Sequence, residues 1–533
     1  MGTRLASIAA SLALSVDLIA QTPGSAARPT PPLGTGTGVI AGSVFGDSGA
    51  PIARARVALS SAAFKSTLTD ERGGFVFASL PPGEYTLSVS RIGYLDVVYG
   101  QRQPGSGRSG TPIRLESGQR FDGIALRMPR GAVITGTVLD ENGEPAIGVP
   151  VRAYRWRNRG GEPTLTASSF DHTDDRGIYR IPFLAPGGYI VAATPRSEID
   201  ALQLAGDTSQ QVAGSYAPVF FPGTTQASEA SLISVGISEE RSNVDIRVQR
   251  VTTGRLAGVV IGTGGSPQSG ASVTLGGSRQ WLTSAGTRSA RTGANGQFAF
   301  TDVPPGSYAL MVRTDGVSPL WGRAEVVTDG RDTSGVQIAL QRGLNVTGTV
   351  NLDVASPESG AAGIRLSLAD AGPFALEEAM TATVQRNGMF ALRNVPPGFY
   401  QLTAASLPAG YSLATAMFGG RDVLDSTLEV SEDLTGVVTI STRSTELTGS
   451  LLDDAGRPVS DYTILAFADE PRFWTRRPRR IQTTRPATDG RFVLRGLPAG
   501  TYHLAVVSDA EPGQETDPEF LRQITAESDL VSL

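Results

Sequence analysis

The sequence predicts an all-β protein, a tandem array of five small antiparallel β-sandwich domains, and three observations support this fold class. First, an aromatic residue stands ten positions before a tyrosine five times along the 533-residue chain, at Phe75/Tyr85, Tyr179/Tyr189, Phe298/Tyr308, Phe390/Tyr400 and Phe492/Tyr502. Second, one glycine precedes each first aromatic residue by two positions, and another follows it by eight. Third, the runs around each pair alternate apolar with polar or small residues, which is typical of strands with one buried face. Such fixed spacing indicates internal repetition of one domain.

Each unit is expected to open with a strand in which a glycine stands between two apolar residues, as in residues 40–44 (IAGSV). A glycine inside a strand indicates a bulge or a close approach of two backbones. A polar turn and a second β-rich run follow, as at residues 55–59. Tight-hairpin signals such as Asn295-Gly296 then lead into the first aromatic strand.

A proline-containing turn that ends in glycine connects the first aromatic strand to the tyrosine strand, as in residues 80–84 (LPPGE). Proline presets φ at the second position of a turn and glycine supplies a positive φ at the third, so this pattern predicts a type II turn. A last alternating run closes the unit, as at residues 124–128. About seven short strands in roughly 100 residues are typical of a small β-sandwich, whose core would contain the aromatic pair.

The repeats predict β-sandwich units at residues 37–129, 130–252, 253–342, 343–443 and 444–533. Unit five has fewer residues after its tyrosine than unit one has, and its tail reads as a short helix near residues 520–523 and a strand from 529. We therefore expect unit five to lack its last strand and to expose a sheet edge that could pair with another chain.

These motifs together resemble the carboxypeptidase regulatory-like domain. The resemblance rests on the glycine-centred opening strand, a Gly-x-Pro turn, the T-D-x-x-G-x-F pattern of residues 69–75 and the L-P-P-G-x-Y-x-L pattern of residues 80–87. It covers nearly all of residues 37–533 and implies a transthyretin- or prealbumin-like sandwich, often classed as a carbohydrate-binding-like fold. Such domains are accessory modules on many unrelated proteins, so the resemblance implies a fold rather than a function.

The composition narrows the class of protein. The net charge of −5, from 46 basic and 51 acidic residues, does not suggest a nucleic-acid partner, and the absence of cysteine excludes disulfides and thiolate metal sites. Residues 1–20 combine Arg4 with an apolar run and predict a signal peptide, followed by a Pro/Gly/Thr-rich linker at 21–36. No other segment could span a bilayer. We expect a secreted, periplasmic or cell-surface protein.

The sequence contains no complete catalytic constellation. Residues 46–49 (GDSG) resemble the nucleophile segment of chymotrypsin-like proteases, but the same position in other units reads as a β-turn. A zinc peptidase site needs two histidines at one metal, whereas His172 and His503 fall in different units, and His503 is expected to face solvent. Calcium at the acidic turns is an alternative to simple turn capping. We predict no catalytic residue, no metal site and no cofactor.

Three of the four tryptophans lie between the second strand and the first aromatic strand of their units, each with an arginine nearby. The predicted ligand-binding residues are Trp156 with Arg155, Trp281 with Arg279, and Trp474 with Arg476. Flat rings beside planar donors suit sugar rings or the side chains of a partner protein. The alternative is that each ring covers an edge strand or seals a junction between domains.

The predicted function is that of a secreted, non-catalytic, multi-domain binding or spacer protein, a rod of five sandwiches with carbohydrate or a cell-surface protein as its partner. The alternative is an accessory or regulatory component of a larger extracytoplasmic machine, such as a peptidase or an outer-membrane receptor. A hydrolase that uses carboxylates is the least favoured hypothesis.

Overall fold

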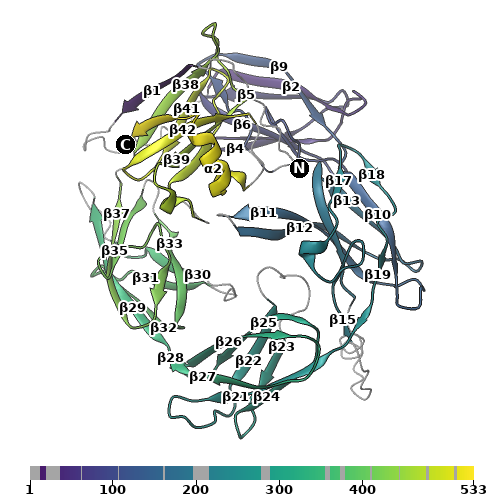
Figure 1. Ribbon diagram of the computed structural model, residues 1–533. Helices are drawn as coiled ribbons and strands as arrows, with labels where there is room; N and C mark the ends of the chain where they lie inside the picture. The colour runs from purple at the N-terminus through teal and green to yellow at the C-terminus, as the bar shows by residue number, and fades with distance from the viewer. Residues whose placement is uncertain are drawn as a thin grey trace.

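The computed structural model describes residues 13–19 and 36–533, except positions 62, 106, 108, 160–161, 196–214, 278–287, 354–360, 372–378, 408–410, 443–444, 476–478 and 509–512. The chain folds into five successive β-sandwich units that are arranged as a ring, with unit five lying beside unit one (Figure 1). The all-β fold class predicted from the sequence is confirmed.

Unit one shows the plan of all five units. Its two sheets comprise β2 (Gly38–Gly46), β5 (Gly74–Leu80) and β9 (Arg120–Met128), packed against β3 (Arg56–Ser60), β4 (Phe64–Leu68), β6 (Gly83–Ser90), β7 (Val97–Val98) and β8 (Ile113–Leu115). The first strand, β2, lies in the middle of its sheet, antiparallel to β5 on one side and parallel to β9 on the other. The closing strand of the unit therefore pairs with its opening strand.

Units two, three and four repeat this arrangement of an opening strand between an antiparallel and a parallel neighbour. The first sheet of unit two comprises β10 (Ala132–Leu139), β13 (Ile178–Leu184), β18 (Glu240–Arg241) and β19 (Ile246–Arg247). Its second sheet comprises β11 (Pro150–Arg159), β12 (Glu162–His172), β14 (Gly187–Ala193), β16 (Val219–Phe220) and β17 (Ile233–Val235). Unit two also contains the paired strands β15 (Ser215–Tyr216) and β20 (Arg250–Val251) and the 3-10 helix η1 (Ala227–Glu229). Unit three comprises β21 (Gly254–Ile261), β24 (Gln297–Val303) and β27 (Thr333–Ala339), against β22 (Ser272–Gly277), β23 (Arg288–Arg291), β25 (Gly306–Arg313), β26 (Leu320–Thr328) and β28 (Gln341–Arg342). Unit four comprises β29 (Leu344–Asp353), β32 (Met389–Val395), β34 (Ser412–Phe418), β35 (Arg421–Asp422) and β37 (Leu434–Ser441), against β30 (Arg365–Asp370), β31 (Met380–Thr383), β33 (Gly398–Ser406) and β36 (Leu428–Val430).

Unit five differs from the others at its opening strand. Its elements are β38 (Glu446–Leu452) and β41 (Arg491–Arg495), against β39 (Thr463–Ala468), β40 (Ile481–Thr484), β42 (Thr501–Val507) and β43 (Asp529–Ser532), with the helix α2 (Pro518–Thr525) and the 3-10 helices η3 (Pro471–Phe473) and η4 (Gln514–Thr516). The short helix and final strand expected in the tail are thus present. The side of β38 opposite β41 pairs with β1 (Ala13–Ile19), from the other end of the chain. The edge that was expected to be open is therefore covered.

Each unit has its own hydrophobic core, and the aromatic pair lies in it, as predicted. Nine of the ten paired rings are at most 5% exposed, and Tyr308 is partly buried. In every unit the tyrosine hydroxyl donates a hydrogen bond to the carbonyl four residues earlier, at 2.5–3.0 Å: Tyr85 to Pro81, Tyr189 to Ala185, Tyr308 to Pro304, Tyr400 to Pro396 and Tyr502 to Pro498. This bond explains why tyrosine, and not phenylalanine, holds the second aromatic position.

The glycine of the opening strand is required by two neighbours at once. A Cβ on Gly42 would lie 2.5 Å from the carbonyl oxygen of Ile124 in the closing strand and 2.8 Å from the ring of Phe75. The equivalent Gly348 would meet the carbonyl oxygen of Gly436 at 2.1 Å and the ring of Phe390 at 2.9 Å. The close backbone approach predicted from the sequence is therefore present, and it makes room for the first aromatic ring.

The prediction of a type II turn at the proline motif is wrong. In units two, three and five the glycine of this motif has φ between 140° and 158°, far from the value of about +80° that a type II turn requires. In units one and four this glycine does not have a left-handed φ. The left-handed residue lies four positions earlier, at Ser79, Phe183, Asp302, Asn394 and Gly496. In unit one Ser79 belongs to a bulge in β5, which shifts the pairing register with β2.

The ring arrangement replaces the expected rod. Unit five contacts unit one through the backbone N–H of Thr488, which donates to the carbonyl of Pro112 at 3.0 Å, and through the Arg485 guanidinium, which donates to the carbonyl of Gly100 at 2.6 Å. Arg114 of unit one also pairs with Asp489 at 3.3 Å. These bonds place the first and the last unit side by side.

Candidate functional site

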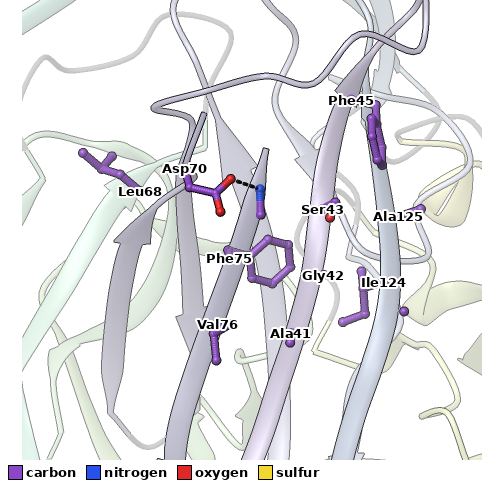
Figure 2. Close-up of a pocket in the computed structure, with 12 residues that line it drawn as sticks. Ala41, Gly42, Ser43, Phe45, Leu68, Asp70, Phe75, Val76, Ile124 and Ala125 are labelled. Atoms are coloured by element: carbon purple, nitrogen blue, oxygen red, sulfur yellow. Dashed lines mark hydrogen bonds between the residues drawn. The ribbon is translucent and has the colours of Figure 1, made fainter. Parts of the chain in front are cut away.

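The outer face of the β5–β2–β9 sheet carries a trough of about 530 Å³, shown in Figure 2. Small residues form its floor: Ala41 and Ser43 on β2, and Gly123 and Ala125 on β9. Larger side chains stand around them, namely Phe45, Leu68 and Val76. We call this surface the unit-one trough.

The trough follows from which residues occupy the outward positions of unit one. Ser43 pairs with Ala125, whereas the equivalent pair in unit three is Val259 with Gln337, so longer side chains stand there. Phe45 has no aromatic counterpart at the equivalent position of the other units, for example Ile261 in unit three. Small residues beside an aromatic wall leave a hollow on a sheet face that would otherwise be flat.

The unit-one trough combines apolar and polar surface. Leu68 and Val76 are about 60% exposed, at 61% and 58%. Asp70 at one end accepts hydrogen bonds from the backbone N–H groups of Arg72 and Gly74, at 2.9 and 2.6 Å, so its carboxylate caps the turn that precedes β5. The surface can contact an apolar face of a ligand, and the Asp70 carboxylate and the Ser43 hydroxyl also line it.

Among the predicted ligand-binding residues, Trp474 is corrected by the structure. Its indole ring is 7% exposed, packs edge-on against Phe467 and donates its N–H to the carbonyl of Ala468 at 2.7 Å. Helix α2 contributes Leu521 and Ile524 to the same cluster. Trp474 is therefore part of a second small core of unit five, and its partner Arg476 lies outside the described residues.

Arg155 and Trp156 are adjacent on β11 but differ in their contacts and in their exposure to solvent. The Arg155 guanidinium lies over the ring of Tyr189 at 4.3 Å and donates to the carbonyls of Ala185 and Pro186, so it braces the proline turn of unit two. Trp156 is 41% exposed. Trp156 alone of the described predicted residues thus remains accessible, since Arg279 and Trp281 fall outside the described residues.

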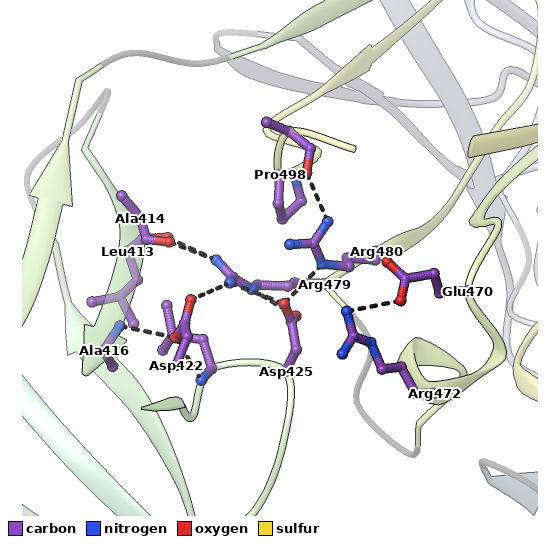
Figure 3. A network of polar contacts seen from close by, with 12 residues as sticks. Leu413, Ala414, Ala416, Asp422, Asp425, Glu470, Arg472, Arg479, Arg480 and Pro498 are labelled. Carbon is purple, nitrogen blue, oxygen red and sulfur yellow. Dashed lines mark hydrogen bonds and ion pairs between the residues drawn. The ribbon is translucent and has the colours of Figure 1, made fainter. Parts of the chain in front are cut away.

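Arg479 and Arg480 of unit five form ion pairs that lock unit five to unit four (Figure 3). Arg479 pairs with Asp425 at 2.7 Å and with Asp422 at 3.2 Å, and donates to the carbonyl of Ala414 at 3.0 Å. Arg480 pairs with the other oxygen of Asp425 at 2.8 Å. Burial raises the pKa of the Asp425 carboxyl, but the hydrogen bonds and charges of the two arginines outweigh it, so the pKa lies below its usual value.

A similar ion pair links units three and four. Arg323 on β26 reaches Asp370 on β30 at 2.9 Å, and the Asp370 side chain is only 2% exposed. Units one and two meet at Asp47, which accepts hydrogen bonds from the backbone N–H of Arg130 and the hydroxyl of Ser238. Asp47 belongs to the segment that resembled a protease nucleophile motif, and that segment is a turn, with Gly49 bonded back to Gly46. These pairings could not be predicted from the repeat pattern, because each joins residues of different units.

His503 does not face solvent as expected. It is 6% exposed, stacks on Phe467 at 5.0 Å between ring centroids, and lies 2.8 Å from both Ser528 Oγ and Asp469 Oδ1. The alternation of β42 predicted an outward position, but α2 covers that face of the sheet. His503 therefore packs in the second core of unit five, far along the chain from His172.

Within the described part of the chain, no group of three or more histidine, cysteine, aspartate or glutamate residues is placed to hold a metal ion. None of the helices there is long and apolar enough to cross a membrane.

One protein family matches two parts of the array. The family described as "Carboxypeptidase regulatory-like domain" matches residues 39–120 and 255–341, which lie in units one and three. These two segments are similar to that family, in agreement with the resemblance noted from the sequence. The other three units repeat the tyrosine hydrogen bond of units one and three, and units two and four also repeat the pairing of the opening strand.

No curated protein matches the chain significantly. Three solved structures are similar to this chain at low sequence identity. The Bacillus anthracis TIE protein is 16% identical over 57% of this chain and 51% of its own, with a TM-score of 0.17, so the match spans about half of that protein. A streptococcal ancillary pilin is 15% identical over 58% and 98% of the two chains, with a TM-score of 0.22. Two B repeat units of the collagen binding protein of Staphylococcus aureus are 12% identical over 76% and 99%, with a TM-score of 0.14.

Proposed function

We propose that this protein is a secreted, non-catalytic binding protein in which five sandwich units hold one another in a ring and unit one presents the ligand surface. The observation that carries the proposal is the unit-one trough, a hollow that is lined by small residues, exposed apolar side chains and the polar groups of Ser43 and Asp70. Carbohydrate is the ligand class we favour, because an aromatic side chain beside small residues accommodates the apolar face of a sugar ring, and hydrogen-bonding groups at the rim fix its orientation.

The ion pairs between units support a binding role over a spacer role. Arg479, Asp425, Arg323 and Asp370 form junctions that are at least half buried. Units held at fixed angles keep a ligand surface in a constant orientation toward its target. A flexible spacer would have no need of such junctions.

The test is binding of the full-length protein to glycan arrays and cell-wall fractions, compared with two variants. Ala125→Trp fills the unit-one trough from an exposed strand position, and we expect it to abolish binding. Gln337→Trp places the same ring at the equivalent exposed position of unit three, and we expect it to bind as the wild type does. Binding that Ala125→Trp leaves unchanged would refute the trough as the site. Absence of binding to every glycan and cell-wall fraction would refute carbohydrate as the ligand.

A further inference from the structure

The opening strand of unit five, β38, has a neighbour that no other opening strand has. In units one, three and four the corresponding side holds the parallel closing strand, β9, β27 or β37. In unit five β1 takes that side, and it runs antiparallel over seven residue pairs, from Ala13 opposite Leu452 to Ile19 opposite Glu446. Figure 1 shows β1 lying along β38.

The register of this pairing matches the apolar alternation of both strands. The apolar positions pair with one another: Leu14 with Leu451, Val16 with Gly449, and Leu18 with Leu447. Leu447 and Leu451 are fully buried in the core of unit five. The polar positions Ser15 and Asp17 pair with Ser450 and Thr448. A slip by one residue would set Ser15 and Asp17 opposite core-facing positions, so the sequence specifies this register.

We propose that the side of β38 opposite β41 is a strand-acceptor site, and that its occupant is residues 13–19 of the same chain. Strand addition satisfies the backbone N–H and C=O groups that the edge of a sheet leaves unpaired, while the alternating side-chain positions give selectivity. Residues 13–19 precede β2 of unit one, so their pairing with β38 clasps the first unit to the last. The same residues carry the export-signal pattern, and removal of residues 1–20 would leave this side of β38 open to another strand of the same alternation.

An engineered disulfide in the full-length chain, produced without export, tests the pairing. Ser15 and Ser450 are direct partners, and facing residues on neighbouring strands lie within the Cα separation of about 4.4–6.8 Å that a disulfide needs. Because the natural chain has no cysteine, the variant with Ser15→Cys and Ser450→Cys can form only this disulfide within one chain. The matched control combines Ser15→Cys with Ser43→Cys, the equivalent opening-strand position of unit one, which already has strands on both sides.

We expect oxidation to cross-link most monomers of the Ser450 variant within one chain, and few monomers of the control, as measured by peptide mass spectrometry. Equal yields in the two variants, or a cross-link that forms only between two chains, would overturn the proposal. A second measurement does not depend on the disulfide. Val16→Pro removes a backbone donor from β1, and we expect it to speed amide hydrogen exchange in β38 at least tenfold while exchange in β29 is unchanged. Unchanged exchange in β38 would also overturn the proposal.

Discussion

Replacement of Tyr400 by phenylalanine tests the hydrogen bond that recurs in all five units. The Tyr400 hydroxyl is buried and donates a hydrogen bond to the carbonyl oxygen of Pro396 at 2.7 Å. Burial is the main cause that raises the pKa of this hydroxyl, and the nearby charge of Asp370 raises it further. The substitution keeps the ring in the core but leaves a buried carbonyl without that donor. Leaving a buried polar group unsatisfied costs about 1–3 kcal/mol. Tyr308→Phe is the matched control, because its bond is longer, at 3.0 Å, and its ring is only partly buried.

Amide hydrogen exchange of the full-length protein resolves the units from one another. Since 1.4 kcal/mol corresponds to a tenfold change, we expect Tyr400→Phe to accelerate exchange in β32 and β33 by roughly 5- to 140-fold, without an effect on unit one. Tyr308→Phe should accelerate exchange in unit three by less. Equal effects of the two substitutions would contradict the reasoning, because the magnitude is assigned to the burial of the bonded pair. No change at Tyr400 would show that solvent or another donor replaces the hydroxyl.

Three further outcomes are expected from the described contacts. The pKa of Asp425 is lowered in the folded protein, so its ion pairs stabilise the junction of units four and five at any pH above the usual carboxyl pKa. This stabilisation is lost as the pH falls through the lowered pKa. Small-angle scattering should therefore show that the array expands in acid but not near neutral pH. Gly348→Ala sets a methyl group against a strand carbonyl, and we expect it to lower the melting temperature of unit four, whereas Gly264→Ala, with nothing within 4 Å, should change little by calorimetry. Trp474→Ala should cost about 3–5 kcal/mol of unfolding free energy in denaturant titrations, and Trp156→Ala less than about 1 kcal/mol, because only the former ring is buried.

The sequence was sufficient to predict the features that repeat within each unit. The aromatic pair, the opening-strand glycine and the glycine two positions before the first aromatic residue all satisfy local requirements of one sandwich, so they recur in each unit. The bulge residue Ser79 and its equivalents escaped notice because four different residue types, as well as glycine, hold this left-handed position.

Contacts between distant parts of the chain could not be predicted from the repeat pattern. Trp474 and His503 are buried by α2, and nothing in the local alternation of β42 indicates that a helix will cover its outer face. The pairing of Arg479 with Asp425 joins two units. The partner of β38 lies more than four hundred positions away, at the other end of the chain. The unit-one trough was missed because it depends on small residues, which carry no signal of their own in a sequence.

The parallel pairing of opening and closing strands has a mechanical consequence. In unit one β2 and β9 run side by side from Val39 with Arg120 to Gly46 with Met128. A force that pulls unit one from its two ends acts on the start of β2 and on the end of β9, which lie at opposite ends of this ladder. The hydrogen bonds between the two strands are then loaded together in shear, and they cannot open one after another like a zipper. Units one, three and four should therefore resist stretching, whereas the load path through unit five would pass through β43 and not through a parallel neighbour of β38.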